Sequence, residues 1–89
     1  MNWTRPHTRV DHLEVNELPD GYVVYQQDVD RVHYLNRTAV LVFELCDGKT
    51  LARDIPALVR TLYGLEAVPQ AEVEACLERF LTEGLILPA

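Results

Sequence analysis

The stretch RVHYLNRTAVLVFELCDG, residues 31–48, contains the change of periodicity that determines how the middle of the chain folds. Its first five residues, Arg31–Leu35, include the strand-forming Val32 and Tyr34 and predict a strand. Asn36 is a favourable helix N-cap, because its side chain can accept hydrogen bonds from the free amides of a first turn. Apolar residues then recur on one helical face as far as Gly48, where we expect the helix to end. The stretch therefore predicts a strand followed directly by a helix.

Two further strands are expected before residue 31. Apolar residues alternate in VDHLEVNEL, residues 10–18, and YVVYQQ, residues 22–27, is again rich in strand-forming side chains. Pro19 and Gly21 provide turn chemistry between them, and residues 28–30 form a short polar connection to the third strand. We expect an antiparallel meander in which His12 and His33 are ordinary strand residues. Residues 1–10 are polar and aperiodic, so we expect a loose tail with a solvated His7.

The second half of the chain predicts two more helices. Thr50 is a candidate N-cap for a helix that ends at Gly64, and Pro56 must either kink this helix or mark the end of an irregular first turn. Pro69 opens the third helix, Gly84 ends it, and residues 85–87 form a short apolar tail that can tuck against the core. The predicted fold class is α+β, in the order β-β-β-α-α-α, with a single domain over residues 11–89.

Composition limits the partners of the chain. Its 89 residues suit one domain, and 14 acidic against 8 basic residues give a net charge of −6. This balance argues against binding to nucleic acid or to anionic membrane surfaces, both of which depend on Lys and Arg. The N-terminus carries no apolar run typical of a signal peptide, and the two cysteines, Cys46 and Cys76, are expected to be buried free thiols. We therefore expect a cytoplasmic protein.

No catalytic or metal site is apparent in the sequence. The three histidines lack ligand spacing, neither cysteine belongs to a C-x-x-C pair, and no phosphate-binding loop or nucleophile motif is present. A cysteine nucleophile would need an exposed thiol beside a base, whereas both thiols fall in apolar helical patterns. We therefore expect no cofactor, no metal and no catalytic residue.

The third predicted strand is the most informative candidate site. In a three-stranded meander it is an edge, with unpaired N–H and C=O groups that natural proteins usually protect with Pro, Lys or a bulge. RVHYL contains no Pro, Lys or Gly, so we expect either a docking site for an added strand or a cover supplied by one of the chain termini.

Four segments together resemble the PqqD-like family, the RiPP recognition elements that bind leader peptides of ribosomally made, later modified peptides. They are VHYLN, TAVLVFELCDGKTL, the LYG that ends the second helix, and VEACLERFLTEGLI, and the resemblance covers roughly residues 13–87. It implies a winged-helix-like fold and binding of the leader as an added antiparallel strand. The residues it implies for backbone pairing are Arg31, Val32, His33, Tyr34 and Leu35. Those it implies for the helical wall of the groove are Glu72, Cys76, Arg79 and Phe80. Cys76 departs from the larger apolar residue that is commoner in the family, and Pro56 interrupts the second helix.

The resemblance implies a non-catalytic module that captures a leader peptide and presents the precursor to a modifying enzyme. The enzymes served by such modules are radical SAM proteins, cyclases or proteases. The alternative is a winged-helix DNA-binding transcriptional regulator. Against it, the third helix carries four acidic residues and one basic residue, and phosphate would repel such a recognition helix.

Overall fold

The three strands predicted in the first half of the chain form one antiparallel sheet in the structure, a computed structural model that describes residues 1–89. The strands are β2 (Leu13–Leu18), β3 (Gly21–Gln26) and β4 (Arg31–Leu35). β3 is central and pairs with both neighbours, and a short 3-10 turn at Gln27–Val29 leads into β4. Gly21 is needed in the hairpin, because a Cβ atom there would lie 2.8 Å from the Leu35 carbonyl oxygen. The predicted meander is therefore present.

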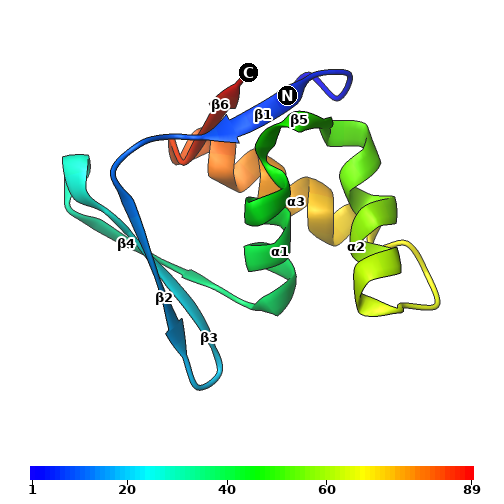
Figure 1. The fold of residues 1–89 in the computed structure, drawn as a ribbon, viewed down its shortest axis with the longest axis horizontal. Helices are drawn as coiled ribbons and strands as arrows, with labels where there is room; N and C mark the ends of the chain where they lie inside the picture. The colour runs from blue at the N-terminus through cyan, green and yellow to red at the C-terminus, as the bar shows by residue number, and fades with distance from the viewer.

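Three helices follow the meander, and they are α1 (Arg37–Leu45), α2 (Ile55–Tyr63) and α3 (Gln70–Thr82). α1 packs against the meander, while α2 lies on the far side of α1 and α3 (Figure 1). Asn36 caps α1 as predicted, with its side-chain oxygen 2.8 Å from the Ala39 amide. Gly64 ends α2 in the left-handed conformation, which a residue without a Cβ adopts at little cost. Pro56 lies in the first turn of α2, after the 3-10 turn Ala52–Asp54, so it marks where an irregular start becomes regular.

A second antiparallel sheet was not predicted. It joins β5 (Asp47–Leu51), β1 (Pro6–Arg9) and β6 (Ile86–Pro88), with β1 in the middle. The prediction of a loose tail over residues 1–10 is therefore wrong, and His7 is buried in β1 rather than solvated. His12 also differs from the prediction, because it lies between β1 and β2 with a left-handed backbone and contacts Asp28. β1 gains its partners from the middle and from the C-terminal end of the chain, which no local pattern reveals.

The segment after α1 also differs from the prediction. α1 ends at Leu45, before Gly48, and the predicted helix from Thr50 begins only at Ile55. The Asp47 carboxylate accepts hydrogen bonds from the backbone amides of Lys49 and Thr50, at 2.9 and 2.8 Å, and so turns the chain into β5. These hydrogen bonds lower the pKa of Asp47, because they favour the ionised carboxylate.

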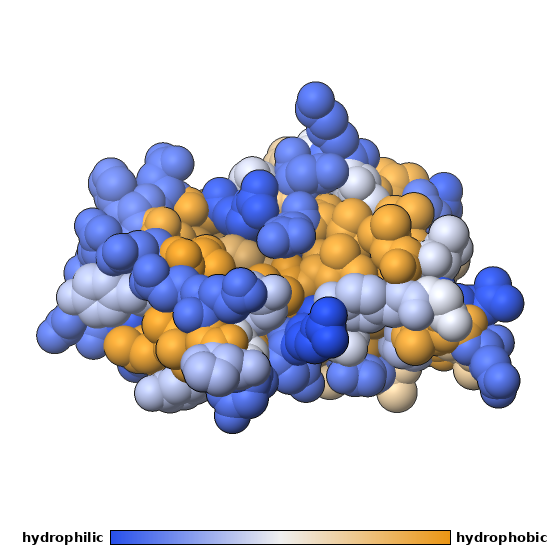
Figure 2. Space-filling model, turned by 60° about the horizontal axis from the view of Figure 1, so that its bottom comes forward, coloured by the Kyte–Doolittle hydropathy of each residue, from blue (hydrophilic) through white to orange (hydrophobic).

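The core lies between the β2–β3–β4 sheet and the helices. Phe43 of α1 and Phe80 of α3 meet edge to face with ring centroids 5.6 Å apart. Leu85 and Ile86 are fully buried against them, so the C-terminal segment packs on the core as expected. Figure 2 shows that apolar side chains on the lower face gather in two areas, one toward the sheet and one toward the helices, with polar side chains between them.

The predicted class, α+β, is confirmed, whereas the simple order β-β-β-α-α-α is wrong. The observed order contains a strand before the meander, a strand between the first two helices and a strand at the C-terminus. The winged-helix-like character of the fold stays a prediction. Contacts of Arg79 with Tyr34 and of Glu83 with His33 place the C-terminal part of α3 beside β4, which is an outer strand of its sheet.

Candidate functional site

β4 lies at an edge of its sheet and has no strand on its outer side. Both chain termini were candidate covers for this edge, but β1 and β6 pair with each other instead, and N and C lie together beside them (Figure 1). An edge strand exposes N–H and C=O groups that lack partners, so β4 offers backbone hydrogen bonds to an added strand.

One side-chain contact reveals which residues of β4 face outward. Nη2 of Arg79 donates to the backbone carbonyl of Tyr34 at 3.2 Å, so this carbonyl points away from β3 and toward α3. In an extended strand the N–H and C=O of one residue point the same way, and successive residues alternate. Tyr34 and Val32 therefore present their backbone groups outward, whereas Arg31, His33 and Leu35 pair with β3. The 2.8 Å approach of the Leu35 oxygen to the Gly21 Cβ position agrees with this assignment.

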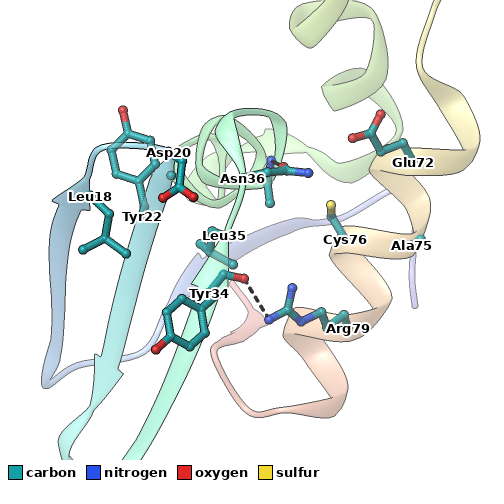
Figure 3. A pocket seen from close by; sticks show the side chains of 12 residues that line it. Leu18, Asp20, Tyr22, Tyr34, Leu35, Asn36, Glu72, Ala75, Cys76 and Arg79 are labelled. Atoms are coloured by element: carbon teal, nitrogen blue, oxygen red, sulfur yellow. Dashed lines mark hydrogen bonds between the residues drawn. The ribbon is translucent and has the colours of Figure 1, made fainter.

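An open groove of about 530 Å³ lies between β4 and α3 (Figure 3). Its floor includes Leu35 and Ala39, and the β2–β3 hairpin and α3 form its walls. Lining residues are Leu18, Asp20, Gly21, Tyr22, Tyr34, Leu35, Asn36, Ala39, Glu72, Ala75, Cys76 and Arg79. A mostly apolar surface with a few charged groups on its rim suits an extended peptide better than a small, fully enclosed substrate.

The α3 wall follows from helical spacing. Glu72, Ala75, Cys76 and Arg79 stand at i, i+3, i+4 and i+7, which places them on one face of the helix. Val73, Leu77 and Phe80 occupy the neighbouring face and are fully buried. The two central groove residues, Ala75 and Cys76, are small and leave room between the helix and β4. The charged residues stand at either end of this face.

The two cysteines differ in their surroundings. Cys46 is fully buried, as predicted, and burial raises the pKa of its thiol to about 12. Cys76 is only half-buried in the groove wall, so the prediction of a second buried thiol is wrong. Burial, together with the negative charge of Glu72, raises the pKa of Cys76, although Arg79 partly opposes the shift. Cys76 therefore remains a neutral thiol at physiological pH, which suits an apolar contact better than nucleophilic attack.

A polar network, buried at His33 and Gln26 and partly exposed at Glu83 and Arg79, ties β4 to the end of α3. His33 is 4 % exposed, and its Nδ1 lies 2.6 Å from a carboxylate oxygen of Glu83. Its Nε2 lies 3.0 Å from the side-chain oxygen of Gln26 on β3. The second oxygen of Glu83 lies 3.8 Å from Nε of Arg79, one helical turn earlier. The network thus fixes the distance between the strand and helix that border the groove.

The structure places the nine residues implied by the resemblance in three settings. Tyr34, Leu35, Glu72, Cys76 and Arg79 line the groove. The exposed Arg31 and Val32 continue the β4 edge beyond the groove lining.

The remaining two residues, His33 and Phe80, direct their side chains into the interior, where Phe80 packs against Phe43. The side chains of His33 and Phe80 therefore support the site from behind, and a bound peptide cannot reach them.

Sequence reasoning missed the opposite wall of the groove. Leu18, Asp20 and Tyr22 come from the β2–β3 hairpin, which the β3–β4 register carries next to Leu35. No local pattern points to them, because the hairpin was identified only as a turn. Ala75 could have been found, since it completes the helical stripe that Glu72 begins.

The described chain holds no group of three His, Cys, Asp or Glu side chains arranged to bind a metal ion. None of its helices has the length and apolar character needed to cross a bilayer.

The chain matches the sequence model of a known protein family. The sequence model of the family described as coenzyme PQQ synthesis protein D (PqqD) matches residues 21–86, which include β3, β4, all three helices and the start of β6. Comparisons with curated proteins and with solved structures returned no match. The match spans well over half of the 89 residues and contains both β4 and α3. The chain therefore belongs to the PqqD family.

Proposed function

We propose that this protein is a non-catalytic module of the cytoplasm that captures the leader of a ribosomally made precursor peptide by strand addition. Membership of the PqqD family supports an accessory, peptide-binding role in the biosynthesis of PQQ or of related modified peptides. The observation that carries the proposal is the open β4 edge beside the groove against α3. The other free edge of this sheet, β2, borders only a smaller cavity of about 230 Å³, which Leu13 and Val15 line.

Backbone pairing supplies only part of the affinity. An antiparallel leader would exchange two hydrogen bonds with Tyr34 and two with Val32, which contribute about 2–6 kcal/mol in total at 0.5–1.5 kcal/mol each. Association costs roughly 4–15 kcal/mol in lost translational, rotational and side-chain freedom. The backbone alone therefore cannot sustain micromolar binding, which needs about −8 kcal/mol. Leader side chains must fill the groove over Leu35, Ala39 and Cys76 to supply the difference.

Binding of this kind would act through local concentration. A leader held on β4 leaves the rest of the precursor free, and a modifying enzyme docked on the same module then meets the substrate at an effective concentration of about millimolar. The module needs no catalytic residue for this role. The partner enzyme would be a radical SAM protein, a cyclase or a protease, as in other systems that use such modules.

The test uses synthetic leaders encoded by short reading frames next to the gene. Titration calorimetry with the whole 89-residue protein should detect one peptide per chain, and amide shifts in NMR spectra should concentrate on β4 and the groove face of α3. Val32→Pro provides the matched control, because it removes an outward N–H donor while the ladder with β3 stays intact. Binding that survives this substitution unchanged, or shifts confined to the opposite sheet, would refute strand addition at β4.

A further inference from the structure

We infer that the groove selects extended peptides in which a basic residue precedes an acidic residue by two or four positions. In such a peptide the guanidinium of Arg79 binds the side chain of the acidic residue. The inference rests on the proposed strand addition and names the chemistry of the leader.

Arg79 occupies the place of an incoming hydrogen-bond donor. Its Nη2 group donates a hydrogen bond to the outward carbonyl of Tyr34 at 3.2 Å (Figure 3). An added strand would use the same carbonyl as an acceptor. A leader N–H must therefore displace the guanidinium or share the oxygen with it. Glu83 offers the displaced group only one oxygen, which lies 3.8 Å from Nε of Arg79, because its other oxygen contacts His33 at 2.6 Å. A carboxylate on the peptide can accept the freed N–H groups and so compensate the exchange.

The other end of the groove carries the opposite charge. Glu72 lies seven residues before Arg79 on the same helical face, about 10 Å away at 1.5 Å per residue. Asp20 faces it from the β2–β3 turn, and Figure 3 shows both at the Asn36 end of the groove, whereas Arg79 and Tyr34 lie at the other end. Neither carboxylate has a cation within ion-pair distance. This end therefore favours a basic side chain.

The direction of β4 sets the order of the two charges on the peptide. Arg79 contacts Tyr34 and Glu83 contacts His33, so α3 runs antiparallel to β4, and Glu72 lies beyond the C-terminal end of the strand. A strand that adds antiparallel to β4 begins near Glu72 and continues toward Arg79. Its basic residue must then come first.

Strand geometry sets the spacing. Residues paired directly across two strands have their side chains on the same face of the sheet. Leader residues paired with Tyr34 and Val32 therefore direct their side chains to solvent, as those two exposed residues do. The leader residues between them direct their side chains toward α3. Positions two and four apart along a strand are separated by about 7 and 13 Å, which brackets the separation of Glu72 and Arg79. An odd spacing would direct one of the two charges into solvent.

The test is selection of random twelve-residue peptides displayed on yeast against the whole protein and three variants. Wild type should enrich Lys or Arg two or four positions before Asp or Glu. Arg79→Gln should lose the acidic preference and keep the basic one, whereas Glu72→Gln should keep the acidic preference and weaken the basic one, since Asp20 remains. Arg79→Lys keeps the charge and should retain the acidic preference. For a selected peptide, neutralising its acid should weaken binding to wild type about three- to tenfold, with no such loss in Arg79→Gln.

The outcomes separate this inference from the proposed function. If wild type enriches no peptide, or if Val32→Pro binds the enriched peptides equally well, strand addition at β4 is wrong. If the enriched peptides depend on Val32 but lack the charge order, or carry it reversed, only the present inference is overturned. The same holds if Arg79→Gln still selects the acid. Melting curves of the variants confirm that each one is folded before its selection is interpreted.

Discussion

Proline substitutions in β4 test the outward assignment of Tyr34 and Val32 most directly. Val32 directs its N–H away from β3, and its side chain is 52 % exposed, so Val32→Pro removes neither a ladder hydrogen bond nor a core contact. His33 pairs with Val24, so His33→Pro deletes a donor and leaves a carbonyl of β3 without its partner. The two adjacent prolines should therefore have opposite effects on stability and on binding.

The magnitudes follow from one hydrogen bond in each case. His33→Pro should lower the free energy of unfolding by about 1–3 kcal/mol relative to His33→Ala. Both variants lose the side-chain contact with Glu83, but only the proline leaves the β3 carbonyl opposite residue 33 without a hydrogen-bond donor. Val32→Pro should stay within about 1 kcal/mol of Val32→Ala, the range of strand propensity. On peptide binding, the lost outward donor should cost Val32→Pro about 1–3 kcal/mol, or roughly 5- to 150-fold in Kd.

The assay combines urea denaturation of the four variants with titration calorimetry of peptides selected on wild type. The alanine variants remove the side-chain contribution, so each proline–alanine difference reports on the backbone alone. If His33→Pro is as stable as His33→Ala, the assignment of inward and outward residues is wrong. If Val32→Pro binds as tightly as Val32→Ala, β4 is not the docking strand.

Four further measurements test other parts of the structure. Burial raises the pKa of the Cys46 thiol to about 12, so the thiol ionises at lower pH in the unfolded chain, and the free energy of unfolding should fall as pH rises from about 9 toward 12. Between neutral pH and pH 10.5, this free energy should decrease by about 2 kcal/mol less in Cys46→Ala than in wild type. Equal decreases in the two proteins would contradict the assignment. A thiol reagent should label Cys76 faster than Cys46 in the native protein, and a bound peptide should slow only Cys76; equal rates would place both thiols in one environment. Glu83→Ala leaves the buried Nδ1 of His33 without a partner and should cost about 1–3 kcal/mol in urea denaturation, with a smaller loss for Glu83→Gln. The protein should bind duplex DNA no better than bovine serum albumin does in a filter assay at physiological salt, and tight, salt-sensitive retention would instead favour the regulator alternative.

The sequence alone determined the features that depend on neighbours along the chain. The alternation before residue 36, the Asn36 cap and the helix that follows are local, because turn residues, caps and side-chain periodicity act within a few positions. The family resemblance likewise assigned Glu72, Cys76 and Arg79 to the groove wall, and their spacing by four and three residues puts them on one face of α3. Residues 31–35 were recognised as an edge because consecutive strands with short loops pair in order.

Only the tertiary structure decided the features that depend on distant partners. Residues 6–9 are too short and too polar to predict a strand, yet they form β1 because residues 47–51 and 86–88 supply hydrogen bonds on both sides. Hydrogen-bond direction in β4 is likewise hidden in the sequence, since both alternating sets of residues fit the same pattern. It is revealed by one contact, from Arg79 to the Tyr34 carbonyl, across 45 residues of chain. Side-chain periodicity encodes which face of a strand is buried, but the choice of pairing partner is made only when separate elements pack together.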